Sequence, residues 1–179
     1  MRIIGGQYQR RLIHPPPSLP VRPTTDKAKE ALFHILNNHF DFENLQVLDL
    51  FAGTGSISYE FASRGAAEVV AVDQNPGCYR FIRKVKAQLD MDNLMPVRAD
   101  AFRYLAACSN EFDIIFADPP YEMAGISRIP NEVFSRKLLA EGGWLILEHG
   151  ATTSFEDHPF FILGKKYSKV HFSFFETAG

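Results

Sequence analysis

The 179-residue sequence has no run of eighteen apolar residues, so we expect no membrane-spanning helix. Its N-terminus lacks the long apolar segment and the cleavage site of a secretory signal peptide. There are only two cysteines, Cys78 and Cys108, and neither belongs to a Cys-x-x-Cys pair. This spacing gives no indication of a disulfide framework or a metal site, and we expect two buried thiols in a protein of the reducing cytoplasm.

Neither sign of charge is in large excess, because the formal net charge is only −2. The charges are unevenly distributed, however, with six basic residues and two acidic residues between Met1 and Glu30. A basic end on an acidic remainder is an asymmetry found in proteins that bind nucleic acid. We therefore divide the chain into a basic N-terminal arm, residues 1–22, and one domain, residues 23–179, as expected for this length.

Short apolar stretches on either side of Gly5 and Gly6 predict two short strands joined by a turn within the arm. The prolines at positions 15–17 and 20 predict a stiff, extended connector. Basic side chains surround Tyr8, which suits contact with phosphates and a nucleobase, although a solvated edge hairpin fits the pattern equally well. The candidate nucleic-acid contacts of the arm are Arg2, Arg10, Arg11 and Arg22.

Beyond the arm, strand-like and helix-like apolar patterns alternate, which predicts an α/β fold with a mostly parallel sheet. A helix of about fifteen residues should begin after Thr24 or Thr25, either of which could cap it. Further helices are expected near 56–64, 76–89, 101–107 and 131–139, and strands at 46–50, 68–73, 95–99, 112–117 and 144–148. Residues 160–175 resemble two strands joined by a polar turn, so an antiparallel hairpin should end the sheet. The basic residues of the 76–89 helix are more typical of a solvated face than of an RNA track.

The motif Asp118-Pro119-Pro120-Tyr121 follows the apolar run at 112–117, at the sheet edge where open α/β folds bind ligands. Proline has a fixed φ and restricts the residue before it, so the Asp118 carboxylate and the Pro119 carbonyl would be two fixed acceptors. Together they could bind both hydrogens of an exocyclic amine and direct its lone pair at an electrophile. The carboxylate would stabilise the positive charge that develops on the nitrogen, and Tyr121 offers a flat face to a base.

The turn after the first strand has the sequence Asp-Leu-Phe-Ala-Gly-Thr-Gly-Ser at residues 49–56. It lacks the third glycine of the dinucleotide fingerprint, and Asp49 would repel a pyrophosphate but attract an ammonium group. At the ends of the next two strands, Asp73 is placed to accept from ribose hydroxyls, and Asp100 could accept from adenine. An amino acid, a ribose and an adenine without phosphate describe S-adenosylmethionine, whose candidate ligands are Asp49, Phe51, Gly53, Gly55, Asp73, Asp100 and Phe102.

Almost end to end, the sequence resembles the RsmD family of 16S ribosomal RNA guanine-N2 methyltransferases. The glycine turn and the Asp118–Tyr121 motif are shared by class I amino-methylating enzymes of the DPPY type. The family-specific part is Arg2-Ile3-Ile4-Gly5-Gly6 and Arg22-Pro23-Thr24-Thr25-Asp26 followed by Glu30-Ala31-Leu32-Phe33. The resemblance implies a Rossmann-like seven-stranded methyltransferase fold with an antiparallel last strand, S-adenosylmethionine as cofactor, and an arm that contacts RNA. It also implies a guanine held by Asp118, Pro119 and Tyr121. Lys27-Ala28-Lys29 departs from the family pattern, which bears on the affinity of the arm for RNA.

Other functions stay open from the sequence. The same chemistry would serve N6-adenine methylation in DNA or RNA, or glutamine methylation in a protein, although glutamine enzymes usually carry Asn in place of Asp118. An NAD-linked oxidoreductase is opposed by Asp49 and the missing glycine, and a non-catalytic RNA-binding module would make no use of the cofactor residues. We expect a monomer that acts on small-subunit ribosomal RNA, either free or in an assembled particle.

Overall fold

A computed structural model describes residues 1–22 and 24–178, so Pro23 of the family-specific stretch lies outside the described residues. Seven strands form one sheet in the order β3-β2-β1-β4-β5-β7-β6. Neighbouring strands from β3 to β5 are parallel, whereas β7 runs antiparallel to both β5 and β6. This confirms the predicted α/β sheet and its antiparallel hairpin. The strands are β1 (Gln46–Asp49), β2 (Glu68–Asp73), β3 (Leu94–Arg98), β4 (Phe112–Ala117), β5 (Leu139–His149), β6 (Phe161–Tyr167) and β7 (Val170–Glu176).

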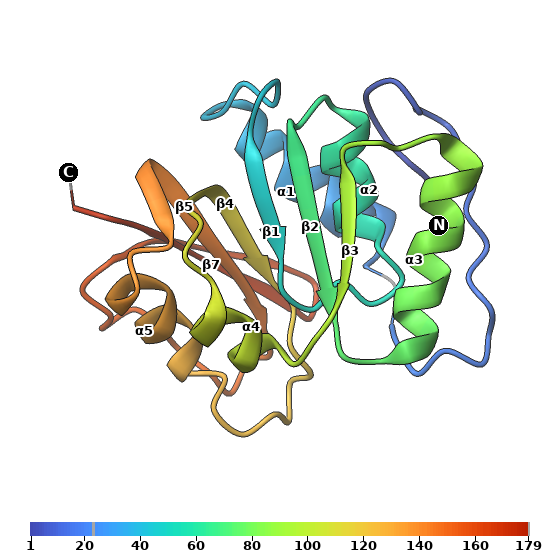
Figure 1. Ribbon diagram of the computed structural model, residues 1–179. Coiled ribbons are helices and arrows are strands. Elements are labelled where there is room, and N and C mark those ends of the chain that lie inside the picture. Colours follow the sequence, from blue (N-terminus) through green and yellow to red (C-terminus); the bar gives the residue numbers. More distant parts are fainter. Residues whose placement is uncertain (23, 179) are drawn as a thin grey trace.

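Helices cover both faces of the sheet and give three layers (Figure 1). They are α1 (Asp26–Asn37), α2 (Ser56–Ser63), α3 (Pro76–Leu89), α4 (Ala101–Ala107) and α5 (Arg128–Ser135). One apolar core joins α1, α2 and α3 to the sheet, and a second core joins α4 and α5 to its other face. The central strands are buried on both faces, which explains why they are continuous apolar runs in the sequence. Within the described residues, no helix is both long and apolar enough to span a membrane.

Several element boundaries differ from the sequence-based expectation. Helix α1 has 12 residues and is capped by Thr25, whose side chain accepts a hydrogen bond from the Ala28 N–H. Helix α5 begins at Arg128 and not near Asn131, because Pro130 is accommodated in the first turn, where its missing N–H leaves no hydrogen bond unmade. Of the two cysteines, Cys78 is buried as expected, but Cys108 at the end of α4 is only half-buried.

The two short strands predicted in the arm are reduced to one short antiparallel pairing. One antiparallel bridge pairs Arg2 with Leu12, backbone hydrogen bonds join Ile3 to Arg10 and Arg11, and residues 5–10 between the paired segments form bends and turns. Gly6 and Arg10 have positive φ values of 80° and 71°, which interrupt an extended hairpin. A Cβ atom on Gly6 would lie 2.0 Å from the Ser63 carbonyl oxygen, so the arm rests directly on the end of α2. The arm therefore takes its shape from the domain beneath it.

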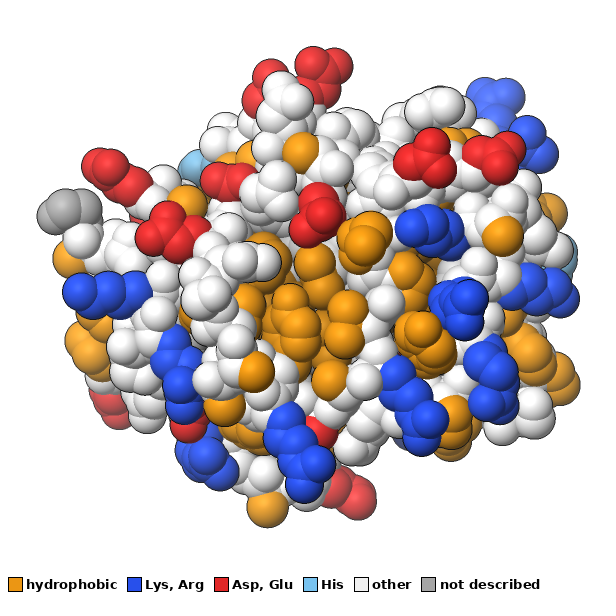
Figure 2. Space-filling view, viewed as in Figure 1, with side chains coloured by type: hydrophobic (Ala, Val, Ile, Leu, Met, Phe, Trp, Pro, Cys, Tyr) orange, Lys and Arg blue, Asp and Glu red, His pale blue; other side chains and the backbone are white. Residues whose placement is uncertain are grey.

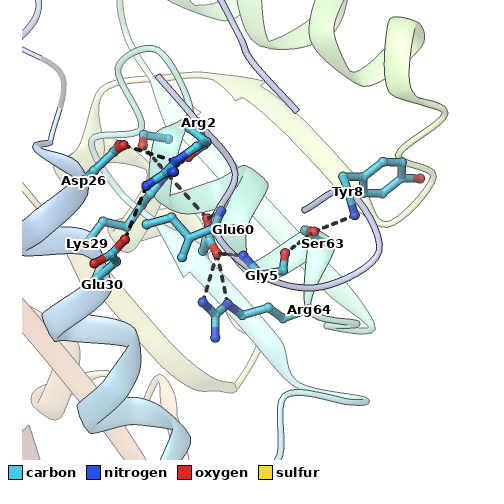
Figure 3. Close-up of polar contacts among 11 residues, drawn as sticks. Arg2, Gly5, Tyr8, Asp26, Lys29, Glu30, Glu60, Ser63 and Arg64 are labelled. Atoms are coloured by element: carbon cyan, nitrogen blue, oxygen red, sulfur yellow. Dashed lines mark hydrogen bonds and ion pairs between the residues drawn. The ribbon is translucent and has the colours of Figure 1, made fainter. Parts of the chain in front are cut away.

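Glu60 of α2 is the residue that holds the arm in place (Figure 3). Its side chain is fully buried and accepts hydrogen bonds from the N–H groups of Ile4, at 3.0 Å, and Gly5, at 2.8 Å. The buried ammonium of Lys29 lies 3.4 Å from Glu60, and the Arg64 guanidinium lies at 3.0 Å. Burial lowers the pKa of Lys29, although the neighbouring Glu60 opposes this effect. Both oxygens of Glu60 thus connect the arm to helices α1 and α2.

Candidate active site

The carboxyl ends of β1, β2, β3 and β4 lie at one edge of the sheet, at the bottom of Figure 1. Each of these strands ends in, or is followed within two residues by, one of the acids singled out in the sequence: Asp49, Asp73, Asp100 and Asp118. Asp49 pairs with Ala71 of β2 and Phe116 of β4. Asp73 and Asp118 therefore extend two residues beyond Asp49 on either side of it. The structure brings the four acids to the edge where parallel sheets bind ligands.

The turn between β1 and α2 favours glycine at both predicted positions. Gly53 and Gly55 have φ values of 58° and 90°, which disfavour side chains. A Cβ atom on Gly55 would also lie 2.5 Å from the ring of Tyr59, which is fully buried. The Gly53 N–H donates to the Asp73 carboxylate at 2.9 Å and ties the turn to the end of β2. This hydrogen bond fixes the position of the glycine turn relative to the carboxyl end of β2.

Asp49 is a buried carboxylate, and in the described part of the chain only one of its two oxygens has a hydrogen-bond partner. Its Oδ2 accepts from the Ser58 hydroxyl at 2.7 Å, whereas its Oδ1 has no hydrogen-bond partner among residues 1–22 and 24–178. Burial raises the pKa of Asp49 to about 7, and the charge of Asp73 adds to the effect. A buried acceptor without a donor is unfavourable, so this oxygen fits a ligand that brings an N–H group, above all a cationic one.

Asp73 and Asp100 have structural partners as well as free acceptor capacity. The two oxygens of Asp73 accept from the N–H groups of Gly53 and Asn75, at 2.9 and 2.8 Å, and each oxygen keeps a second lone pair. Asp100 caps α4 by accepting from the Arg103 N–H at 3.0 Å. This capping bond uses only the Oδ1 atom of Asp100.

Two predicted aromatic residues lie close to this edge. Phe51 is half-buried in the turn, and Phe102 is half-buried in the first turn of α4. The Arg128 guanidinium lies 4.8 Å from the centroid of the Phe102 ring, so one ring face already carries a cation. Sequence reasoning missed Arg128, because no local pattern connects it to Phe102.

The connector of the arm passes over the same edge. A Cβ atom on Gly53 would lie 3.7 Å from Val21, and one on Gly77, at the start of α3, would lie 2.8 Å from Leu19. Among the predicted RNA contacts, Arg10, Arg11 and Arg22 are exposed. Arg2 is exposed too, but its guanidinium is 3.4 Å from the carboxylates of both Asp26 and Glu30 (Figure 3). The arm therefore both covers the glycine turn and displays basic side chains near it.

The Asp118–Tyr121 motif directly follows the end of β4. Burial raises the pKa of Asp118 well above its usual value, and the charges of Glu148 and Asp49 raise it further. Pro119 is buried, whereas Tyr121 is 41% exposed, which is high for a large aromatic side chain. The Tyr121 ring lies over Gly150, where a Cβ atom would be 3.2 Å from the ring. The motif thus combines a half-buried carboxyl group with an exposed aromatic side chain.

Sequence reasoning also missed Glu148, which lies in β5 beside the motif. Its side chain is 5% exposed, and its Oε1 accepts a hydrogen bond from the Tyr121 hydroxyl at 3.2 Å. Burial raises the pKa of Glu148 to about 7, and the hydrogen bond from Tyr121 opposes the shift. The sequence did contain a signal for this residue. Glu148 is an acid at the end of the apolar run 144–148, just as Asp49 and Asp73 are acids at the ends of apolar runs.

The surface charge is divided between the two edges of the sheet. In Figure 2, viewed as in Figure 1, most acidic side chains lie along the upper part of the face and most basic ones lie in the lower half. Acids precede or begin the strands, namely Asp41, Glu43, Glu68, Asp92, Glu111, Asp113 and Glu141. Exposed arginines gather where the strands end, namely Arg22, Arg80, Arg98, Arg103 and Arg128. The candidate site therefore lies within the basic half of a protein whose net charge is negative.

The strand order, the antiparallel β7 and the glycine turn after β1 define a class I methyltransferase fold, as predicted. The chain belongs to the family described as "Conserved hypothetical protein 95", which matches residues 1–176 and is the RsmD family suggested by its motifs. Over 145 residues it is 34% identical to the Escherichia coli protein named ribosomal RNA small subunit methyltransferase D, spanning 81% of this chain and 69% of that protein.

Solved structures agree with this assignment. The structure of the Escherichia coli protein YhhF matches with a TM-score of 0.86 and 28% identity, and the match covers 98% of this chain and 96% of that one. The Thermus thermophilus 16S rRNA N2 G1207 methyltransferase RsmC, solved with AdoMet and guanosine, matches with a TM-score of 0.71. Its identity is 23%, over 90% of this chain and 46% of that chain, so it supports the fold alone.

Proposed function

We propose that this protein transfers a methyl group from S-adenosylmethionine to the exocyclic N2 amine of a guanine in small-subunit ribosomal RNA. The observation that carries the proposal is the position of Asp118, whose half-buried side chain follows the end of β4, next to the strand that ends at Asp49. In a member of this family, such a carboxyl group beside the glycine turn favours an amine acceptor near a cationic methyl donor.

The residues at the glycine turn fit the cofactor. When bound, S-adenosylmethionine supplies an electrophilic methyl group on a sulfonium ion. The free Oδ1 of Asp49 would accept from its ammonium group, and the remaining lone pairs of Asp73 would accept from the ribose hydroxyls. Asp100 and the open face of Phe102 would hold the adenine, while Phe51, Gly53 and Gly55 form the turn that the amino-acid part approaches.

The target base would be held by the motif after β4. The Asp118 carboxylate and the Pro119 carbonyl accept the two N2 hydrogens, so the nitrogen lone pair is directed at the methyl group, and Tyr121 stacks on the base. Such positioning can contribute on the order of 7–11 kcal/mol to lowering the barrier. No covalent enzyme intermediate is required, and burial raises the pKa of the Cys78 thiol to about 11, which makes it a poor nucleophile.

The charge distribution supports an RNA substrate. Exposed arginines surround the candidate site, so the phosphate backbone is attracted to the edge that carries the chemistry and repelled from the opposite edge. Arg10, Arg11 and Arg22 of the arm extend this basic surface. Arg2 contributes less, because its charge is shared with two acids. We further propose that the protein acts as a monomer in the cytoplasm, on free RNA or on an assembled particle.

The test is to map N2-methylguanosine in small-subunit RNA from cells with and without the protein. One modified guanine should lose its methyl group in the deletion strain and regain it with the wild-type gene but not with Asp118→Ala. Asp113→Ala is a matched control, because Asp113 lies in the same strand at the opposite edge of the sheet. An unchanged modification pattern in the deletion strain would refute the proposal.

A further inference from the structure

Glu148 has a feature that the proposed methyl transfer leaves unused. Its side chain is almost completely buried, and only one of its two carboxylate oxygens has a partner in the described structure. The Tyr121 hydroxyl donates to Oε1, whereas Oε2 is buried without a hydrogen bond. A carboxylate that is buried in this way is unfavourable unless a ligand supplies the missing donor.

The position of Glu148 ties it to the target base. The last pair of residues between β4 and β5 is Ala117 and Leu147, so Asp118 and Glu148 are the next residues on adjacent parallel strands. The two carboxyl groups also interact electrostatically. After burial, the charge of Glu148 is the largest cause of the raised pKa of Asp118. Tyr121 connects the two positions, since it lies three residues after Asp118 in the motif and its hydroxyl donates to Glu148. A base that stacks on Tyr121 with its amine at Asp118 would therefore present its adjacent ring edge to Glu148.

The chemistry of that edge differs between the two purines that carry an exocyclic amine. In guanine, the ring nitrogen N1 next to the N2 amine carries a hydrogen and is a donor. In adenine, the ring nitrogen N1 next to the N6 amine carries a lone pair and is an acceptor. A carboxylate oxygen beside the amine site is complementary to the guanine edge and repels the adenine edge.

We propose that Glu148 is the specificity-determining residue of this site and that its free Oε2 accepts a hydrogen bond from the guanine N1–H. The inference rests on the proposed function and deepens it by assigning the selection of guanine to one side chain. Asp118 and Pro119 bind the amine that reacts, and Glu148 recognises the base that carries it. Tyr121 holds the Glu148 carboxylate so that Oε1 is occupied and Oε2 faces the incoming base.

A base analogue tests this assignment directly. The 2-aminopurine ribonucleotide keeps the amine at position 2, but its N1 has a lone pair and no hydrogen. Small-subunit RNA is prepared with either guanosine or 2-aminopurine at the mapped target position and presented in the form that the wild-type protein methylates. The measured quantity is the ratio of kcat/KM for the two RNAs, since differences in amine reactivity between the bases cancel when variants are compared.

The wild-type protein should prefer guanosine by at least about a hundredfold, because a site built to accept a hydrogen bond rejects an analogue that lacks the donor. Glu148→Gln should lower that preference by at least about tenfold, since the amide can rotate to donate to the N1 lone pair. Glu148→Asp and Tyr121→Phe both keep a negative charge at this position, so each should lose rate but retain a preference for guanosine. Glu141→Gln, an exposed glutamate at the other end of β5, is the matched control and should behave as wild type.

An equal preference for guanosine in the wild-type protein and in Glu148→Gln would overturn the assignment. A purely structural role for Glu148 would lower both rates together and leave their ratio unchanged. These results differ from a failure of the proposed function, in which the wild-type protein would methylate neither RNA. Folding of each variant is checked by its thermal stabilisation on addition of S-adenosylhomocysteine, which does not depend on the target base.

Discussion

Replacing Asp49 with asparagine should make the ligand-free protein more stable and at the same time unable to bind its cofactor. The Asp49 carboxylate is buried, and one of its oxygens has no partner within residues 1–22 and 24–178. Burial raises its pKa from 3.8 to about 7, and each pKa unit corresponds to 1.36 kcal/mol, so the ionised carboxylate destabilises the fold by about 4 kcal/mol. Asparagine has the same shape and no charge. Its amide also needs partners, so the expected gain at about pH 8 is roughly 2–4 kcal/mol.

The sign of the pH dependence follows from the direction of the shift. Because the pKa of Asp49 is higher in the folded state, the folded protein binds the proton more tightly, and this contribution to stability is lost as pH rises from about 4 through about 7. At about pH 5 the wild-type side chain is already neutral, so Asp49→Asn should gain much less there. The difference between the two proteins should therefore widen with increasing pH.

The assay is urea denaturation of both proteins at about pH 5 and pH 8, with and without S-adenosylhomocysteine. At a ligand concentration of about 100 times its Kd, the wild-type protein should gain about 2.7 kcal/mol, whereas Asp49→Asn should gain almost nothing. The exposed Asp41→Asn is a control that should change neither quantity. The reasoning is refuted if Asp49→Asn is less stable than wild type at about pH 8 and is still stabilised by the ligand.

Three further predictions follow from the same geometry. Asp118→Ala should keep cofactor binding, measured by calorimetry, but lose at least about a hundredfold in single-turnover methyl transfer, because the amine loses its fixed acceptor; near-normal turnover would dispose of this role. The value of kcat/KM should rise as pH increases through about 7, since burial raises the pKa of Glu148 to about 7 and its carboxyl group is the stronger hydrogen-bond acceptor once ionised, and a flat profile would contradict this. Glu60→Gln should lower the free energy of unfolding by about 3–5 kcal/mol, because Lys29 stays buried without its counter-charge, whereas the exposed Glu43→Gln should change little; equal effects would argue against the anchor.

Most of the sheet could be predicted because its central strands are buried on both faces. Such strands are uninterrupted apolar runs, and each of the first four leads to an acid at the same edge of the sheet, from Asp49 to Asp118. The glycine turn was equally predictable, since only a residue without a Cβ atom fits against Tyr59. Local sequence is sufficient where burial and backbone conformation are determined by neighbouring residues.

The errors arose where distant residues decide the structure. The arm looked like a hairpin, but the N–H groups of Ile4 and Gly5 bind Glu60, more than fifty residues away. Arg128 over Phe102 and Tyr121 against Glu148 also depend on tertiary contacts, which no local periodicity encodes. Helix α5 begins three residues before the expected position 131, with Pro130 inside its first turn.

The most direct test of the central claim uses the purified protein, S-adenosylmethionine with a tritiated methyl group, and small-subunit RNA or particles from cells that lack the gene. After digestion of the RNA to nucleosides, the label should be recovered as N2-methylguanosine from a single position, and Asp118→Ala should give almost none. Recovery of the label as N6-methyladenosine, or equal labelling by Asp118→Ala, would contradict the proposed chemistry.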